Sequence, residues 1–66
     1  MSRFIEVTNQ FRRIKTLVNL HQIEEIRREE DGSALIIYAF QRYNKSIIDT
    51  LKTIESYEEV KAMIIN

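Results

Sequence analysis

The sequence lacks most of the residues that cross-link or punctuate a small domain: it has no cysteine, no proline and no tryptophan. Without cysteine the chain can form no disulfide and no thiolate metal site, and the single histidine, His21, cannot supply a two-histidine metal site. Gly32 is the one glycine. Element boundaries must therefore be inferred from periodicity and capping residues, and we expect neither a metal nor another cofactor.

The sequence also lacks an excess of either charge and any long apolar run. Ten lysines and arginines balance ten aspartates and glutamates, so no long-range field attracts nucleic acid, anionic lipid or acidic substrates. The longest apolar run, residues 34–40, is far shorter than the roughly 20 residues of a membrane-spanning helix, and the first residues lack the apolar core of a signal peptide. We expect a cytoplasmic protein with no membrane partner.

The residues that are present are those of a folded domain, with 44% apolar and 30% charged residues in a chain of 66. This composition predicts one domain over residues 1–66. A core of this size contributes only about 3–5 kcal/mol of stability unless something reinforces it. Because disulfides are excluded, we expect a homo-oligomer, since self-association is the remaining way to add buried surface.

The N-terminal third predicts two strands. Residues 2–8 and 15–20 are rich in β-branched and aromatic side chains that alternate with polar ones, a pattern typical of strands. Asn9 and Gln10 between them indicate a turn.

The middle of the chain predicts a long hairpin. Residues 34–40 have no polar face, which predicts a central strand covered on both sides. The polar segment 41–46 has turn residues, and residues 47–55 then predict a strand that pairs back on the central one.

Residues 19–32 allow two interpretations. Apolar residues recur at helical spacing, Asn19 is a good N-cap and Gly32 a good stop, so local rules favour a helix. The alternative is a short turn at residues 20–22, a strand over 23–29 and a hairpin turn over 30–33.

The C-terminal segment predicts the one well-defined helix. Ser56 and Glu59 have the spacing of a capping box, in which each side chain bonds the other residue's backbone N–H. An apolar stripe of helical period follows, made of Tyr57, Val60, Met63 and Ile64.

Five segments in this order resemble a family of small bacterial flagellar and swarming-motility proteins called FlbD-like. The segments are Phe4–Thr8, Leu17–Ile23, Glu24–Arg27, Ser33–Ile37 and Lys52–Val60. The resemblance implies that the segment after Ile23 is a strand, and we follow it there over the helical spacing. It also implies an α+β fold, a small antiparallel sheet of four to five strands with one C-terminal helix, and no catalytic residues.

The sequence departs from this family between Phe40 and Leu51. The family has a tight hairpin with an Asn-Gly turn there, whereas this chain has several additional residues and no glycine. The resemblance therefore does not fix the length of this hairpin.

No residue pattern predicts catalysis or metal binding. His21 has only Asn19, Gln22 and Glu24 as polar neighbours in the sequence, which does not make an oriented catalytic group. Acidic residues between positions 24 and 31 lack the spacing of a calcium loop and alternate with arginines. We predict a solvated face there and a protein that is not an enzyme.

The leading functional hypothesis is a small interaction or regulatory protein that self-associates through an apolar sheet face or a strand edge. The apolar residues around the predicted hairpin exceed what one short helix can cover. Those we predict to bind a partner, itself unidentified, are Ile36, Tyr38, Phe40 and Ile48.

The alternative is a small nucleic-acid-binding module. It would use basic loops around residues 12–15 and 42–45, if both lie at one end of the sheet. The basic residues involved are Arg12, Arg13, Lys15, Arg42 and Lys45. Zero net charge and the lack of an RNA-binding motif argue against this alternative.

Overall fold

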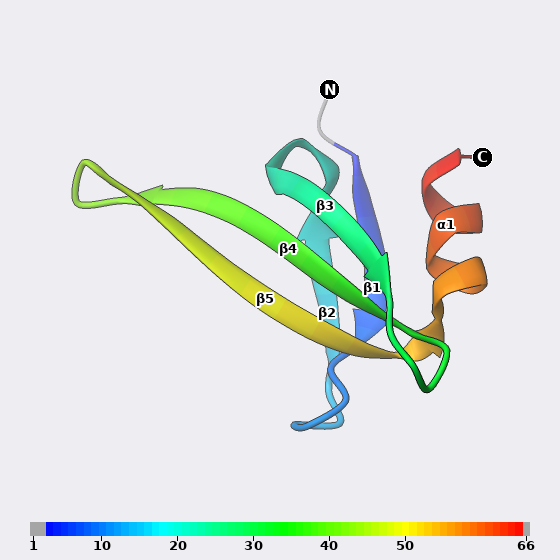
Figure 1. Ribbon diagram of the computed structural model, residues 1–66. Helices are drawn as coiled ribbons and strands as arrows, with labels where there is room; N and C mark the ends of the chain where they lie inside the picture. The colour runs from blue at the N-terminus through cyan, green and yellow to red at the C-terminus, as the bar shows by residue number, and fades with distance from the viewer. Residues whose placement is uncertain (1–2, 66) are drawn as a thin grey trace.

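The computed structural model describes residues 3–65 and contains five strands, one short 3-10 turn and one helix (Figure 1). In chain order the elements are β1 (Phe4–Thr8), β2 (Lys15–Asn19), η1 (Leu20–Gln22), β3 (Ile23–Arg28), β4 (Ser33–Arg42), β5 (Lys45–Ser56) and α1 (Tyr57–Ile65). The predicted α+β class, the antiparallel pairing and the C-terminal helix are confirmed. No helix in the described part of the chain is long and apolar enough to cross a membrane.

The strands form two sheets rather than the single sheet that the sequence predicts. β1 pairs with β2, and β3, β4 and β5 pair in that order. Strand pairing between the two sheets is limited, within the described residues, to an isolated bridge between Asn9, which follows β1, and Thr53 of β5. One reason lies at Thr8, whose backbone N–H donates to the Glu55 carboxylate at 2.7 Å instead of to a β5 carbonyl. A side chain thus replaces the backbone partner that would have joined the two sheets.

The core lies between the two sheets and the helix. It is made of aliphatic residues from β1, β2, β4, β5 and α1: Ile5, Val7, Val18, Ala34, Ile36, Leu51 and Val60. Tyr57, Met63 and Ile64, the rest of the predicted helical stripe, pack against it. The period of the sequence therefore identified the buried face of α1 correctly.

Residues 19–32 adopt the second of the two interpretations. Asn19 does cap a turn, since its side chain accepts from the His21 N–H at 2.9 Å, but the turn is only η1 and the strand β3 follows. The favoured helical spacing fails because Ile26 and Ile23 pair with Ile36 and Tyr38 of β4. Pairing across the sheet buries these isoleucines, so tertiary contacts override the local preference.

The capping box at the start of α1 is confirmed. The Ser56 hydroxyl accepts from the Glu59 N–H, and the Glu59 carboxylate accepts from the Ser56 N–H, both at 3.1 Å. Each side chain satisfies a backbone donor that the first helical turn leaves without a partner.

The hairpin between β4 and β5 is long and has a two-residue turn. Tyr43 and Asn44 have φ values of 51° and 60°, the positive φ at both central residues that a type I′ turn requires. Asparagine tolerates this conformation, and Tyr43 adopts it without glycine. The residues between Phe40 and Leu51 therefore lie mostly in the two strands, which have 10 and 12 residues, and not in a long loop.

Candidate interaction surface

The three-stranded sheet has one covered face and one open face. Directly opposite residues of an antiparallel pair share a face, and Ile36 opposes Ile26 on one side and Leu51 on the other. These residues belong to the core or pack against it, so this is the inner face. The intervening positions of β4, which include Leu35 and Ile37, lie on the outer face.

The outer face carries an apolar row between charged flanks. Leu35, Ile37 and Ala39 of β4 are half-buried, and Ile48 of β5 is 69% exposed opposite Ala39. Their neighbours in β3 and β5 are polar or charged: Glu25, Arg27, Thr50 and Lys52. No element among residues 3–65 packs over this row (Figure 1). The predicted cover on both sides of the central strand is therefore wrong for the outer side.

The predicted partner-binding residues divide between the two faces. Ile36 is fully buried, so its prediction as a partner-binding residue is wrong. Tyr38 and Phe40 are half-buried on the inner side, with ring centroids 6.0 Å apart. Only Ile48 belongs to the open face. The sequence did not show which of residues 34–40 point to the inner face and which to the outer face, because both alternating sets are apolar. Leu35 and Ala39 were therefore missed.

The far half of the hairpin forms an arm that leaves the rest of the molecule. The last β3 residue to pair with β4 is Ile23, opposite Tyr38. Residues 39–48, here called the hairpin arm, are therefore two-stranded and project away from the other elements (Figure 1). A two-stranded hairpin is at best marginally stable alone. The arm nevertheless carries Phe40, Ile47 and Ile48, so its apolar side chains lack the cover that the base of the sheet has.

The two basic groups of the nucleic-acid hypothesis lie apart. Arg12 and Arg13 are in the loop between β1 and β2, and Arg12 shares a cavity with Asp49. Arg42 and Lys45 flank the arm turn, four residue pairs beyond Asp49, which is roughly 13 Å at about 3.3 Å per residue. The prediction that both groups meet at one end of the sheet is wrong. Each group is exposed, but they do not make one continuous site.

Two of the basic side chains already have partners. Lys15, at the start of β2, lies 3.8 Å from the Glu6 carboxylate across the strand pair. The Arg42 guanidinium lies 5.7 Å from the centre of the Tyr43 ring. The positive groups are thus distributed over β2, its preceding loop and the arm.

The cavity beside Arg12 has a volume of about 360 Å³ and is largely polar. On its floor the Tyr38 hydroxyl donates a long hydrogen bond of 3.4 Å to the Asp49 carboxylate. Partial burial, together with the charge of Asp49, raises the pKa of Tyr38. The phenol therefore stays protonated at neutral pH.

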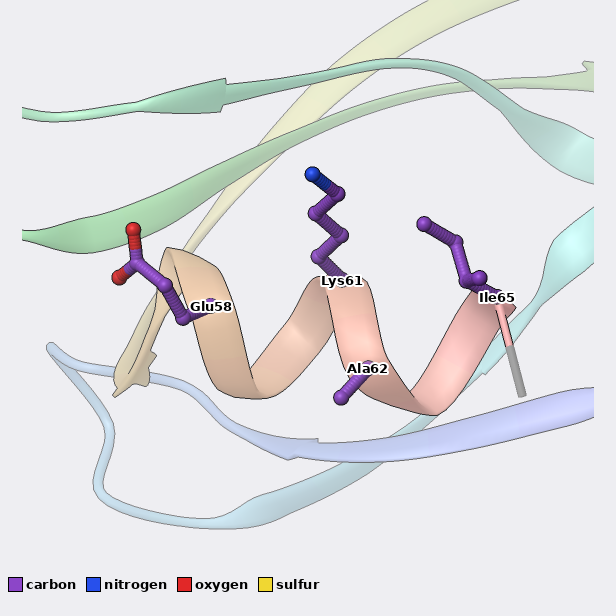
Figure 2. A pocket seen from close by; sticks show the side chains of 4 residues that line it. All are labelled: Glu58, Lys61, Ala62 and Ile65. Atoms are coloured by element: carbon purple, nitrogen blue, oxygen red, sulfur yellow. The ribbon is translucent and has the colours of Figure 1, made fainter.

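A second hollow, of about 400 Å³, lies on the outer side of α1 (Figure 2). Its lining residues are one exposed stripe of the helix: Glu58, Lys61, Ala62 and Ile65. All four come from a single helix, so the hollow is an open surface of α1 and does not enclose a ligand.

Ion pairs involve two of the five acidic residues between positions 24 and 31. Glu25 accepts from Arg27 at 2.5 Å, and Asp31 lies 3.3 Å from the Lys52 ammonium. Hydrogen bonds from the Ser33 hydroxyl and N–H, with the charge of Lys52, hold the pKa of Asp31 well below its usual range. Within residues 3–65, no three acidic or histidine side chains are grouped as metal ligands. His21 lies exposed in η1, a polar residue in a turn as predicted.

Comparison of the chain with models of protein families, with curated proteins and with solved structures gave no match. The resemblance to the FlbD-like family therefore stays a prediction.

Proposed function

We propose that this chain is a non-enzymatic interaction protein that self-associates through its three-stranded sheet. The observation that carries the proposal is the uncovered outer side of β3, β4 and β5, with its apolar row of Leu35, Ile37, Ala39 and Ile48. Contiguous apolar surface bordered by charged residues is typical of protein-binding surfaces. Covering it gains about 25 cal/mol per Å² of apolar area before the cost of association is subtracted.

The size of the core supports this proposal. The buried hydrophobic residues number seven among those described, and a core this small is marginal on its own. Association with a second copy stabilises the folded chain by mass action, because only the folded form offers the sheet. A regulatory role would follow if other proteins compete for the same sheet.

Sedimentation equilibrium over a dilution series tests the proposal, together with the melting temperature at each concentration. We expect a mass above that of one 7.9 kDa chain at micromolar concentration, and a melting temperature that falls on dilution. A monomer at all concentrations, with a constant melting temperature, would contradict the proposal.

The hairpin arm favours a second candidate function, the binding of single-stranded nucleic acid. Residues 39–48 contain two of the ten basic residues and none of the ten acidic ones, so the arm has a charge of +2 and the remainder −2. Tyr43 is 86% exposed beside Arg42 at the tip, and an exposed aromatic ring next to cations is how unpaired bases are stacked and held.

Fluorescence anisotropy with a labelled oligonucleotide separates the two functions. Phosphate contacts would make the affinity fall steeply with salt, and a Tyr43→Ala variant would then bind more weakly than a Phe11→Ala control in the other loop. Absence of salt-dependent binding would contradict the second candidate function.

A further inference from the structure

The outer edge of β3 is an unpaired edge of the three-stranded sheet, and it belongs to the sheet that carries the apolar row. β3 pairs only with β4 among residues 3–65, and its pairing is regular from Glu25 to Arg28. The outer edge of β5 is partly used, because the Gln10 N–H donates to the Lys52 carbonyl at 2.8 Å. β3 has no proline, and its one irregularity lies between Ile23 and Glu25. The outer edge of β3 therefore has no strand partner in the described chain. The helix α1 meets only its C-terminal end, where Arg28 pairs with Glu58 and lies 4.9 Å from the centre of the Tyr57 ring.

Symmetry limits how two copies of β3 can pair. In an antiparallel pair made by a two-fold axis perpendicular to the sheet, one residue lies opposite its own copy. A register centred on Glu25 places two glutamates face to face, and one centred on Arg27 places two arginines face to face. Like charges directly opposite destabilise a strand pair. A register centred on Arg28 likewise places two arginines face to face, so within the regular stretch only the register centred on Ile26 avoids a like-charge pair.

The register centred on Ile26 is complementary in charge and in face. It places Glu25 opposite Arg27 of the partner subunit, and Arg27 opposite Glu25 of the partner subunit. Both residues lie on the outer face, since they oppose Ile37 and Leu35 of β4. Ile26, which packs toward the core, meets its own copy on the inner face. The strand segment is thus its own antiparallel complement.

We propose that a second copy of this chain pairs with the outer edge of β3, with the two-fold axis at Ile26. The result is a six-stranded sheet in which the open outer faces of both copies become continuous. Glu25 and Arg27, already 2.5 Å apart within one chain, join the same two residues of the partner in a ring of four alternating charges. This inference rests on the proposed self-association and adds an edge contact to it; the apolar rows of the two copies stay open in this pairing and form one larger apolar surface.

The charges on β3 could instead only keep the edge soluble, as charged residues on edge strands commonly do. An edge strand whose charges only prevent pairing would repel a second copy of itself in every antiparallel register. Within its regular stretch, β3 repels its copy in the registers centred on Glu25, Arg27 and Arg28 and attracts it in the register centred on Ile26.

Charge reversal tests the pairing by sedimentation equilibrium, with circular dichroism to check the fold. Glu25→Arg and Arg27→Glu each create two like-charge pairs across the proposed interface, so each variant alone should dimerise about tenfold more weakly or worse. Both side chains are at least half exposed, so the fold should tolerate the changes. Lys45→Glu, at the tip of the arm, is the matched control and should dimerise like the original chain.

The decisive result is rescue. An equimolar mixture of Glu25→Arg and Arg27→Glu chains should form a heterodimer, and the double variant carrying both changes should form a homodimer again. Dimerisation that is insensitive to the single changes, or that neither the mixture nor the double variant restores, would overturn the β3 pairing while leaving self-association through the outer face intact. A monomeric original chain would overturn the proposed function as well.

Discussion

The base of the hairpin and its arm are built from similar residues but differ in what covers them. At the base, Ile36 and Leu51 face each other and are buried under β1, β2 and α1. In the arm, Phe40 faces Ile47 in the same continuous register, yet both are only half-buried. Strand formation therefore needs no more than local pattern and a suitable turn, whereas burial depends on which distant element lies across the strand.

The largest expected effect is the difference in stability cost between a substitution at the base of the hairpin and one in the arm. Replacing Ile36 by Ala should cost about 2–5 kcal/mol, because the lost side chain leaves a cavity in a closed core. Replacing Ile48 by Ala should change stability by less than about 0.5 kcal/mol, because that side chain is mostly exposed. Urea unfolding at a concentration low enough to keep the chain monomeric measures both. If Ile36→Ala does not fold, Ile36→Val should cost about 0.5–1.5 kcal/mol. Equal costs for the base and arm variants would contradict the assignment of the core.

A smaller loss of stability is expected for a substitution at the base of the hairpin, where the register of β4 and β5 shifts. The pairing of β4 with β5 shifts between Ser33 and Leu35. There the buried Thr53 hydroxyl accepts from the Ala34 N–H at 3.2 Å and donates to the Glu55 carbonyl at 2.8 Å. Thr53→Val keeps the shape but removes these partners, so it should cost about 1–3 kcal/mol. Thr50→Val, on the exposed outer face, is the control. A neutral Thr53→Val, measured by urea unfolding, would mean that the hydroxyl does not replace the missing ladder bonds.

The helix cap gives the next effect. Ser56→Ala removes the acceptor for the Glu59 N–H and should cost about 0.5–2 kcal/mol. Ser46→Ala, an exposed serine in the arm, should be close to neutral. Thermal unfolding of the two variants gives the comparison, and equal midpoints would remove the capping assignment.

How far the sequence predicts this fold depends on whether the signal is local. The capping box of Ser56 and Glu59 and the apolar stripe of α1 are local, and both were predicted correctly. The strand at residues 23–28 was not decidable from local spacing, because the partner that buries Ile26 lies ten residues further along, at Ile36. Two further features also depend on partners that are distant in the sequence and could not be predicted from it. They are the face to which each of residues 34–40 points and the separation of the two sheets at Thr8. The charge complementarity around Ile26 becomes visible only once β3 is known to be an edge strand.

The smallest effect concerns pH, and it should be confined to the base because the arm contains no carboxylate. Partial burial raises the pKa of Glu55, but hydrogen bonds from the Thr8 N–H and hydroxyl outweigh it and lower the pKa. A lowered pKa means that the unfolded chain binds more protons, so this carboxylate stabilises the fold above its unfolded pKa of about 4.3. That contribution is lost as the pH falls through the folded pKa.

Urea midpoints at pH 6 and pH 3 should therefore show a smaller pH dependence for Glu55→Gln than for the original chain. An unchanged dependence would mean that Thr8 and Glu55 do not hold the two sheets together in solution.

Amide hydrogen exchange at two protein concentrations tests the central claim, self-association through the edge of β3, most directly. At low concentration the outward amides of residues 25–28 should exchange fast, since no strand in the described chain pairs with them. At a concentration where sedimentation shows the dimer, the same amides should become protected, while the amides of the hairpin arm remain unchanged. Protection that appears only in the arm or along β5, with β3 unchanged, would contradict the account.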